Sequence, residues 1–213
     1  MADHAVDDIG ARWSIVIPVK RLDRAKTRLE LPPELRSELA LAMAMDTVAA
    51  AAACPAVDEV VVVTDDPRAA EAVTSLGARV VADHPDAGLN PALRHGASVV
   101  DGDWVGFVSS DLPALTADAL AAVLHAATGH ESAFVADAAG IGTTMLLARA
   151  DAAVEPRFGA GSRRAHQAAG IADVTAVAPA GARRDVDTVA DLRVAAEQRV
   201  GAATTALLPA ALA

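Results

Sequence analysis

The feature that most constrains the fold is an alternation of short Val- and Ile-rich runs with longer Ala-rich segments. Four such runs, each ended by turn residues, predict buried strands at 13–19, 58–66, 78–83 and 103–113. The segments between them predict helices at 33–53, 67–77 and 90–102, with Pro33 in the first turn of the first helix and Gly77 ending the second. Strand, helix and strand at this spacing predict right-handed βαβ units around a mostly parallel sheet.

The rest of the chain continues the alternation. It predicts a helix at 114–129, two strands joined by a glycine-containing turn at 132–148 and a short helix at 161–170. A strand at 172–179 and a last helix at 185–198 follow. Thr116 is a candidate N-cap, and Thr188 and Asp191 have capping-box spacing. There is no internal repeat or low-complexity linker. We therefore expect one α/β domain over 1–213, with its core at about 13–198 and mobile termini, and a ligand at the carboxyl ends of the strands.

Composition excludes several classes of function. The 213 residues suffice for one sizeable core, and the formal net charge of −10 argues against the broad basic face that nucleic acids require. A small anionic ligand needs only a local basic pocket. The single cysteine, Cys54, cannot form an internal disulfide and is interpreted as a buried thiol of a reducing cytoplasm. The acidic start has no signal-peptide pattern and no stretch of about 20 apolar residues occurs, so we expect a soluble cytoplasmic protein without membrane contact.

One loop gathers positive charge in this acidic chain. Directly after the first predicted strand come five cations within nine positions, namely Lys20, Arg21, Arg24, Lys26 and Arg28. These charges repel one another unless they share an anion, and a nucleoside triphosphate would fit that need. The alternative is a solvated basic turn. The loop lacks the glycines of a P-loop, so that motif is absent.

Acidic residues follow two other segments. Asp111 ends the fourth predicted strand at the same sheet edge as the basic loop, where a carboxylate could hold Mg²⁺ on phosphate oxygens; the alternative is a residue that only ends a strand. Asp185 and Asp187 alternate along an extended segment and could face the same side. Asp187 is interpreted first as the N-cap of the last helix, whereas pairing with Arg183 or Arg184 is the structural alternative for Asp185.

Loops of small residues supply further candidates. Thr143 and Thr144 follow a glycine turn, and a helix start reinforced by two arginines contains Gly159, Gly161 and Ser162. Backbone N–H groups at such a start can bind an anion, although Ser162 could instead cap the helix. Weaker candidates for contacts to a base or ribose are Thr64, Asp65 and Asn90. The six histidines show no metal-binding spacing, and no Ser–His–Asp pattern can be argued.

Taken in order, these motifs resemble a known family. The segments "IPVKRLDRAKTRL", "VVTDD", "GLNPAL", "SSDLPAL", "GIGTTML", "RFGAGSRRAH" and "RRDVDTVADL" are similar to those of the CofC/FbiD guanylyltransferases of coenzyme F-420 biosynthesis. The resemblance covers the chain from about Ile15 to Leu192. It implies a single-domain, three-layer α/β/α nucleotidyltransferase-like fold, Rossmann-like with a mostly parallel central sheet.

The resemblance also implies an activity. GMP would pass from GTP to phosphoenolpyruvate, with release of pyrophosphate and formation of enolpyruvyl-2-diphospho-5'-guanosine; 2-phospho-L-lactate and 3-phosphoglycerate are the alternative acceptors. A downstream F-420 transferase would be a partner. By motif, Asp111 and Asp185 would hold Mg²⁺, expected as two ions and replaceable by Mn²⁺. The acceptor acid would be held by Thr143 (preferred to Thr144 because it follows Gly142), Gly159 and Ser162.

The nucleotide side follows from the same motifs. Lys20 and Lys26 would act on the triphosphate as catalytic cations, and the nucleotide-binding residues would be Pro18, Val19, Lys20, Lys26, Thr64, Asp65 and Asn90.

Two rival interpretations remain open. A nucleotidyltransferase for molybdopterin or methylerythritol phosphate would share the early basic loop and a late metal-binding Asp, but the molybdopterin type has a glycine-rich loop that residues 18–29 lack. A nucleotide sensor of the same fold would bind GTP without metal-dependent turnover. The presence of both Asp111 and Asp185 argues against the sensor.

Overall fold

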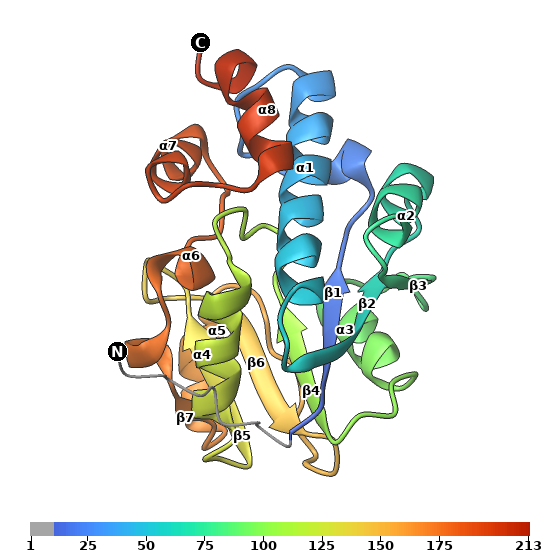
Figure 1. Cartoon of the computed structure of the whole chain (residues 1–213), viewed down its shortest axis with the longest axis vertical. Coiled ribbons are helices and arrows are strands. Elements are labelled where there is room, and N and C mark those ends of the chain that lie inside the picture. The colour runs from blue at the N-terminus through green and yellow to red at the C-terminus, as the bar shows by residue number, and fades with distance from the viewer. Residues whose placement is uncertain (1–10) are drawn as a thin grey trace, which may run out of the picture.

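A computed structural model describes residues 11–213 and shows a seven-stranded sheet in the order β3-β2-β1-β4-β6-β5-β7 (Figure 1). The strands are β1 (Trp13–Pro18), β2 (Val57–Val63), β3 (Arg79–Val81), β4 (Trp104–Val108), β5 (Ser132–Ala136), β6 (Thr143–Arg149) and β7 (Ala172–Asp173). β1 pairs in parallel with β2 and β4, whereas β6 runs antiparallel to β4 and β5. The predicted mostly parallel sheet is confirmed.

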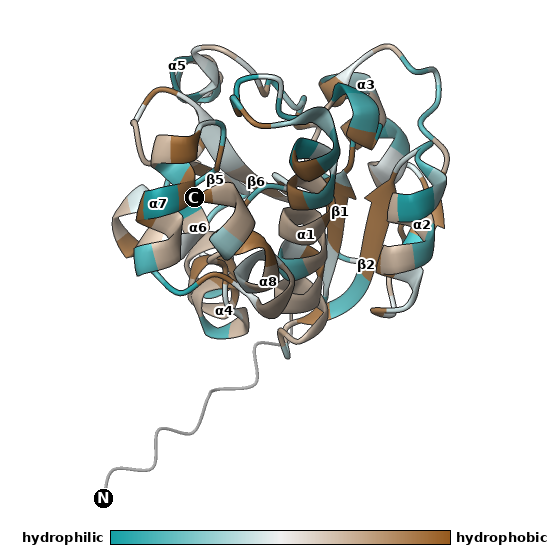
Figure 2. Ribbon diagram, turned by 90° about the horizontal axis from the view of Figure 1, so that it is seen from above, coloured by the Kyte–Doolittle hydropathy of each residue, from teal (hydrophilic) through white to brown (hydrophobic). Residues whose placement is uncertain are grey.

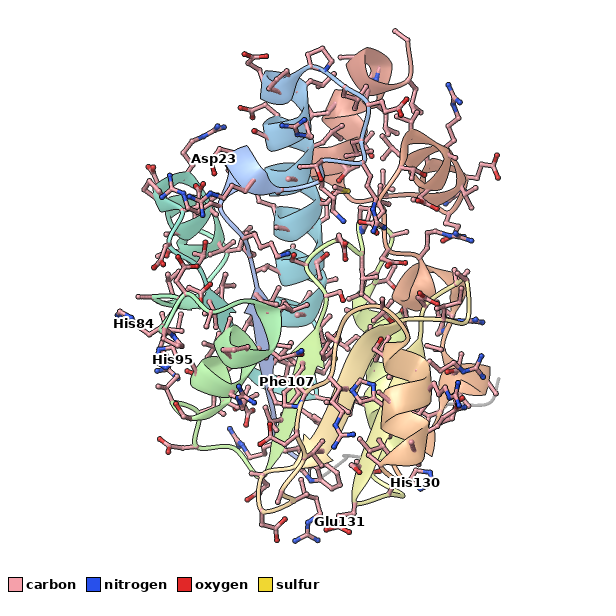
Figure 3. All side chains as sticks on the ribbon, turned by 180° about the vertical axis from the view of Figure 1, so that it is seen from behind. Asp23, His84, His95, Phe107, His130 and Glu131 are labelled. Carbon is pink, nitrogen blue, oxygen red and sulfur yellow. The ribbon has the colours of Figure 1, made fainter. Side chains whose placement is uncertain are left out.

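Helices cover both faces of the sheet. They are α1 (Pro33–Ala52), α2 (Pro67–Thr74), α3 (Leu89–Ala97), α4 (Ala117–Ala127), α5 (Ser162–Ala168), α6 (Ala180–Arg183), α7 (Val189–Glu197) and α8 (Ala202–Ala211), with 3₁₀ turns η1 (Leu22–Arg24) and η2 (Thr175–Val177). One core cluster joins α1, α2 and α4 to one face, and a second joins α3 to the other, where Phe107 lies beneath it (Figure 3). The three-layer α/β/α architecture is therefore confirmed.

Apolar side chains explain the central strands. All six residues of β1 are buried, as expected for a strand covered on both faces. In Figure 2 the carboxyl-terminal half of β2 is hydrophobic, while α2 beside it carries hydrophilic residues. Gly96 brings α3 against this sheet, because a Cβ there would lie 2.4 Å from Val16 Cγ1. These contacts position the carboxyl ends of β1 and β2 under α3.

The carboxyl-terminal third contains the differences from expectation. The strand predicted at 172–179 is wrong, because β7 ends at Asp173 and η2 follows. There the Thr175 hydroxyl accepts the N–H of Ala136, so a side chain replaces strand pairing. The last segment forms a further helix, α8, which packs on α1 and whose Ala203 and Thr204 N–H groups donate to Asp46.

Several local predictions can be compared directly. Thr116 caps α4 by accepting from the N–H of Ala119, and Thr188 caps α7 in a capping box with Asp191, which confirms both signals. The default interpretation of Asp187 as that N-cap is wrong, since Thr188 holds the position. Cys54 is buried, as expected.

Two findings concern the ends of the chain and the membrane. No helix within 11–213 combines the length and apolarity needed to cross a bilayer. The stretch on which the absence of a signal peptide was predicted, 1–10, lies outside the described residues.

Candidate active site

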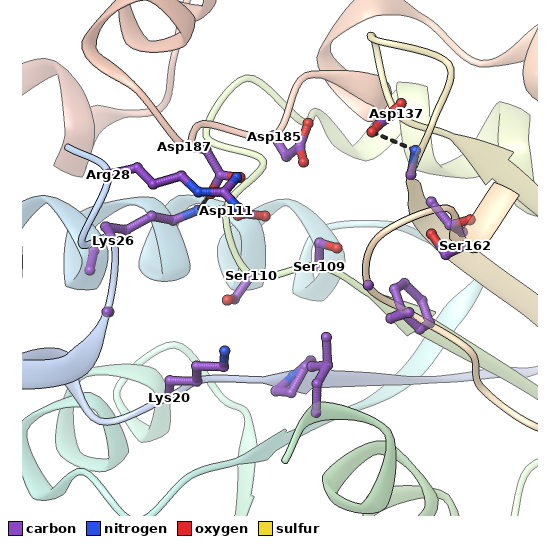
Figure 4. A pocket seen from close by; sticks show the side chains of 18 of the residues that line it. Lys20, Lys26, Arg28, Ser109, Ser110, Asp111, Asp137, Ser162, Asp185 and Asp187 are labelled. Atoms are coloured by element: carbon purple, nitrogen blue, oxygen red, sulfur yellow. Dashed lines mark hydrogen bonds and ion pairs between the residues drawn. The ribbon is translucent and has the colours of Figure 1, made fainter.

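A cavity of about 560 Å³ opens at the carboxyl ends of β1 and β4 (Figure 4). Its wall combines the basic loop, the end of β4, the glycine turn before β6, the loop before α5 and the segment before α7. Eleven of the residues predicted as site residues or as their cationic neighbours contribute to this wall, namely Pro18, Val19, Lys20, Arg24, Lys26, Arg28, Asp111, Thr143, Gly159, Ser162 and Asp185. The cavity therefore lies where ligands of open α/β sheets bind.

A backbone contact brings the two distant acidic segments together. The N–H of Val186 donates to the backbone carbonyl of Asp111 at 3.1 Å, and the Val186 side chain is fully buried. Because residues on either side of a buried one point the other way in an extended segment, Asp185 and Asp187 both face the cavity. Gly181 permits this approach, since a Cβ there would lie 2.1 Å from the carbonyl oxygen of Ala114.

Lys26 lies between two of these acids. Its ammonium group donates to Asp111 and, at 2.9 Å, to Asp187 Oδ1, and Arg28 approaches Asp187 at 3.4 Å. Burial lowers the pKa of Lys26, but the charges of Asp111 and Asp187 outweigh it and raise the pKa above its ordinary value. Lys26 also has a left-handed backbone with φ 53°, which is strained for a residue other than glycine. The structure thus makes Lys26 the counter-charge of the acidic cluster.

Among the described residues, Asp185 has no such counter-charge. Burial first, and then the nearby charges of Asp111, Asp137 and Asp187, raise the pKa of Asp185 to about 7. Asp111 Oδ1 is buried and has no hydrogen-bond partner among the described residues. An ionised Asp185 beside an unpartnered Asp111 oxygen is an arrangement that a cation would stabilise.

These carboxylates fit a hard divalent cation. Mg²⁺ is commonly held by one or two carboxylates together with substrate phosphates and water. Within residues 11–213 no group of three or more His, Cys, Asp or Glu side chains is arranged to hold a metal alone. Of the histidines, His84, His95 and His130 lie at the margins of the molecule (Figure 3). Asp111 and Asp185 would therefore form an incomplete ligand set that phosphate oxygens complete.

Asp137 is a site residue that the sequence analysis missed. It follows β5, and its two carboxylate oxygens accept the N–H groups of Ile141 and Gly142 at 2.9 and 2.7 Å. A Cβ on Gly142 would lie 2.4 Å from Asp137 Oδ2, so this tight turn requires glycine. The available signal was its position at the end of a strand, the same one that identified Asp111. Its carboxylate shapes the turn that presents Thr143 to the cavity.

The structure separates the two candidate threonines. Thr143 lines the cavity, whereas Thr144 is fully buried and donates to the carbonyl oxygen of Ala182 at 2.8 Å. Ser162 also lines the cavity, and its buried hydroxyl has no partner within the described residues. Gly161, with φ 73°, is the N-cap of α5, so the alternative that Ser162 caps this helix is wrong.

Some of the residues predicted to bind the nucleotide line a cavity and others do not. Lys20 extends into the cavity opposite the aspartates (Figure 4), and Pro18, Val19 and Lys20 also line an adjoining cavity of about 130 Å³ together with Asp65.

Two other nucleotide-side candidates line neither cavity. The Asn90 side chain is occupied by the backbone of Phe158, donating to its carbonyl at 3.1 Å and accepting from its N–H at 2.8 Å. Thr64 accepts the N–H of Asp66. The structure therefore gives both residues a local structural contact and does not place them on a cavity wall.

Solved structures define the class to which this fold belongs. A structure described as a nucleotide-diphospho-sugar transferase from Desulfovibrio desulfuricans G20 aligns with a TM-score of 0.68 and 19% identity over 92% of this chain and 94% of its own. A nucleotidyl transferase from a Methanothermobacter species aligns with a TM-score of 0.61 and 18% identity, over 88% of this chain and 97% of its own. The fold is that of the α/β nucleotidyltransferases.

Sequence comparison narrows the class to one family. Residues 13–170 match the family model described as guanylyl transferase CofC like, and the chain belongs to that family of enzymes. The phosphoenolpyruvate guanylyltransferase of Thermomonospora curvata is 50% identical over 212 residues, covering 97% of this chain and 93% of the relative. That of Streptomyces coelicolor is 50% identical over 202 residues, covering 92% and 95%.

Proposed function

We propose that this protein transfers the guanylyl group of GTP to phosphoenolpyruvate, releasing pyrophosphate and forming enolpyruvyl-2-diphospho-5'-guanosine. The relatives of about 50% identity are named phosphoenolpyruvate guanylyltransferases, which supports guanylyl transfer to this acceptor. The observation that carries the proposal is one cavity in which Lys20 faces Asp111 and Asp185, while Thr143 and Ser162 line its other end, where the Ser162 hydroxyl has no partner among residues 11–213. We place the reaction in the cytoplasm and in coenzyme F-420 biosynthesis, with a downstream F-420 transferase as the consumer of the product.

The main obstacle to this reaction is charge repulsion. Two unit charges about 4 Å apart repel by about 4 kcal/mol at an effective dielectric near 20, and both substrates carry several charges. Lys20 has no carboxylate within salt-bridge distance among residues 11–213, so its ammonium group remains available for the triphosphate. Lys26 adds charge where the triphosphate meets the acids. These lysines offset repulsion between substrates and favour the departing pyrophosphate.

Asp111 and Asp185 are proposed as the ligands of Mg²⁺, expected as two ions and replaceable by Mn²⁺. When bound, the metal would neutralise phosphate charge and polarise the α-phosphate. Two observations support this assignment: the raised pKa of Asp185, which has no cation beside it among residues 11–213, and the Asp111 Oδ1 atom, which stays without a hydrogen-bond partner although Lys26 pairs with Oδ2. Asp187, paired with Lys26 and Arg28, is not needed as a ligand.

The acceptor is proposed to bind at the opposite end of the cavity. Thr143, Gly159 and Ser162 line this end, and hydroxyl and backbone N–H groups suit the phosphate and carboxylate of a small acid. An ionised phosphate oxygen of the acceptor attacks the α-phosphorus of GTP. One phosphorus–oxygen bond forms, the bond to the β-phosphate oxygen breaks, and pyrophosphate leaves with the electron pair. No general base is required, since the attacking oxygen is already ionised near neutral pH.

The test is a pyrophosphate-release assay that crosses the four nucleoside triphosphates with phosphoenolpyruvate, 2-phospho-L-lactate and 3-phosphoglycerate. We expect release with GTP and phosphoenolpyruvate in the presence of Mg²⁺, and its loss in Asp111→Asn with the fold intact. The downstream transferase is added in parallel to consume an unstable product. Turnover only with another acid would replace the proposed acceptor. Binding of GTP without turnover under any combination would favour the sensor.

A further inference from the structure

A fully buried histidine lies behind the acceptor end of the cavity. His166, on α5, is 0% exposed and its ring packs between Phe134 and Phe158, with ring centroids 5.7 and 5.8 Å away. Its Nε2 accepts the backbone N–H of Arg157 at 3.2 Å, and its Nδ1 lies 3.0 Å from Thr143 Oγ1. His166 therefore connects the loop before α5 with the first residue of β6.

These contacts determine which ring nitrogen carries the proton. A backbone N–H can only donate, so Nε2, which faces that of Arg157, must be unprotonated. Burial, and then the charge of Arg157, lower the pKa of His166 to about 4, so the ring is neutral near pH 7. A neutral imidazole holds one proton, which must then be on Nδ1. His166 consequently donates to Thr143 Oγ1.

The tautomer of His166 determines what Thr143 offers the cavity. When Thr143 Oγ1 accepts from Nδ1–H, its own hydroxyl proton is free to donate elsewhere. No second hydrogen-bond partner of this hydroxyl occurs within residues 11–213, and Thr143 lines the cavity. With the opposite tautomer the hydroxyl would donate to Nδ1 and turn lone pairs toward the cavity, which would repel an anion.

We propose that His166 is a positioning residue for the acceptor acid, because its Nδ1–H bond to Thr143 directs the Thr143 hydroxyl proton toward an anionic oxygen of that acid. The inference rests on the proposed function for the identity of the acid. His166 does not touch the acceptor and takes no part in proton transfer. Ser162, one helical turn before His166 on α5, presents the second hydroxyl of the same wall.

Two variants of similar packing cost separate the bonds of His166. In His166→Asn the side-chain amide can replace the Nδ1 donor to Thr143 but cannot reach Arg157, whereas in His166→Gln the amide oxygen can replace Nε2 but leaves Thr143 without its donor. We expect His166→Gln to raise the KM for phosphoenolpyruvate about tenfold more than His166→Asn does, with a change in the KM for GTP within about twofold in both. A larger effect of His166→Asn, or equal rises for both substrates, would overturn the proposal.

The variant Thr143→Val tests whether His166 acts through Thr143. Valine lacks the hydroxyl, so His166→Gln should add less than about threefold to the KM for phosphoenolpyruvate in the Thr143→Val background. Independent, multiplying effects would show that His166 acts through some other group and would overturn the proposal. Thermal unfolding of each variant identifies losses of folded protein.

A spectroscopic measurement needs neither variants nor turnover. Nitrogen-15 NMR of the histidine rings in the whole wild-type protein at pH 7 should show His166 with a protonated Nδ1 and an unprotonated Nε2. A protonated Nε2 would contradict the proposal even if every variant failed to fold. Because this result does not depend on the substrate, it also distinguishes failure of the inference from failure of the proposed function, which the pyrophosphate assay reports.

Discussion

Replacement of Asp185 by Asn should make the metal-free protein more stable while it abolishes turnover. Asp185 lies in the cavity wall close enough to Asp111, Asp137 and Asp187 for each of them to oppose its ionisation. Asn has nearly the same shape and no charge, so Asp185→Asn removes that repulsion and also removes a proposed metal ligand. An acid that destabilises the empty protein is expected where a cation is to be bound.

The magnitude follows from the pKa. A rise in the pKa of Asp185 from 3.8 to about 7 means that its full ionisation destabilises the folded state by about 4 kcal/mol. Because Asp185 is partly exposed, solvent screening reduces the value, and we expect about 2 kcal/mol. The pKa of Asp185 is higher in the folded protein than in the unfolded chain, so wild type has its full stability at low pH, where Asp185 is protonated. Its free energy of unfolding then decreases by this amount as pH rises from about 4 to about 7. The gain in Asp185→Asn should therefore be small at pH 4 and complete at pH 8.

Urea unfolding of both proteins at several pH values, without divalent cations, measures this difference. Asp187→Asn is the matched control, since burial raises the pKa of Asp187 but Lys26, Arg28 and Lys20 lower it more, so its loss should destabilise the protein at pH 8. Added Mg²⁺ with GTP should stabilise wild type and not Asp185→Asn. Equal stability of wild type and Asp185→Asn across this pH range would refute the reasoning.

Three further predictions concern the other parts of the site. Lys26→Ala should lower kcat/KM for GTP about 10- to 100-fold, and the decrease, measured from initial rates, should be larger at low ionic strength than at high. The same variant should be less stable in urea unfolding, because Asp111 and Asp187 lose their counter-charge. Ser162→Ala should raise the KM for the acceptor about tenfold and leave that for GTP nearly unchanged in steady-state kinetics, and equal rises would place Ser162 elsewhere. Burial and Arg157 hold the pKa of His166 at about 4 in the folded protein, against 6.5 in the unfolded chain. The stability that neutral His166 contributes should therefore be complete above pH 6.5 and should fall by about 3 kcal/mol as pH drops to 4. Urea unfolding should show this pH dependence in wild type and not in His166→Gln.

Local patterns in the sequence predicted much of the fold. Buried strands such as β1 and capping residues such as Thr116 and Thr188 leave short-range signals, so their elements could be placed without a structure. The strand predicted at 172–179 was wrong because a long-range contact, from Ala136 to the hydroxyl of Thr175, competes with strand pairing there. Such contacts leave no periodic pattern.

In the candidate site, too, local signals could be read from the sequence and long-range contacts could not. Position after a strand identified Asp111, alternation along an extended segment identified Asp185 and Asp187, and the family resemblance selected Asp185 of the two as a metal ligand. The bond from Val186 to Asp111 that brings the acids together could not be read from the chain. The pairing of Lys26 with Asp111 has no sequence signal either. His166 showed no metal-binding spacing and was not selected, because its tautomer depends on Arg157 and Thr143, which are distant from each other in sequence.

The most direct test of the whole account is a crystal structure with Mn²⁺ and a non-hydrolysable GTP analogue, in which anomalous scattering locates the metal. We predict Mn²⁺ in coordination with Asp111, Asp185 and phosphate oxygens, with Lys20 on the triphosphate. A metal bound elsewhere, or a triphosphate held with both carboxylates free of metal, would contradict the central claim.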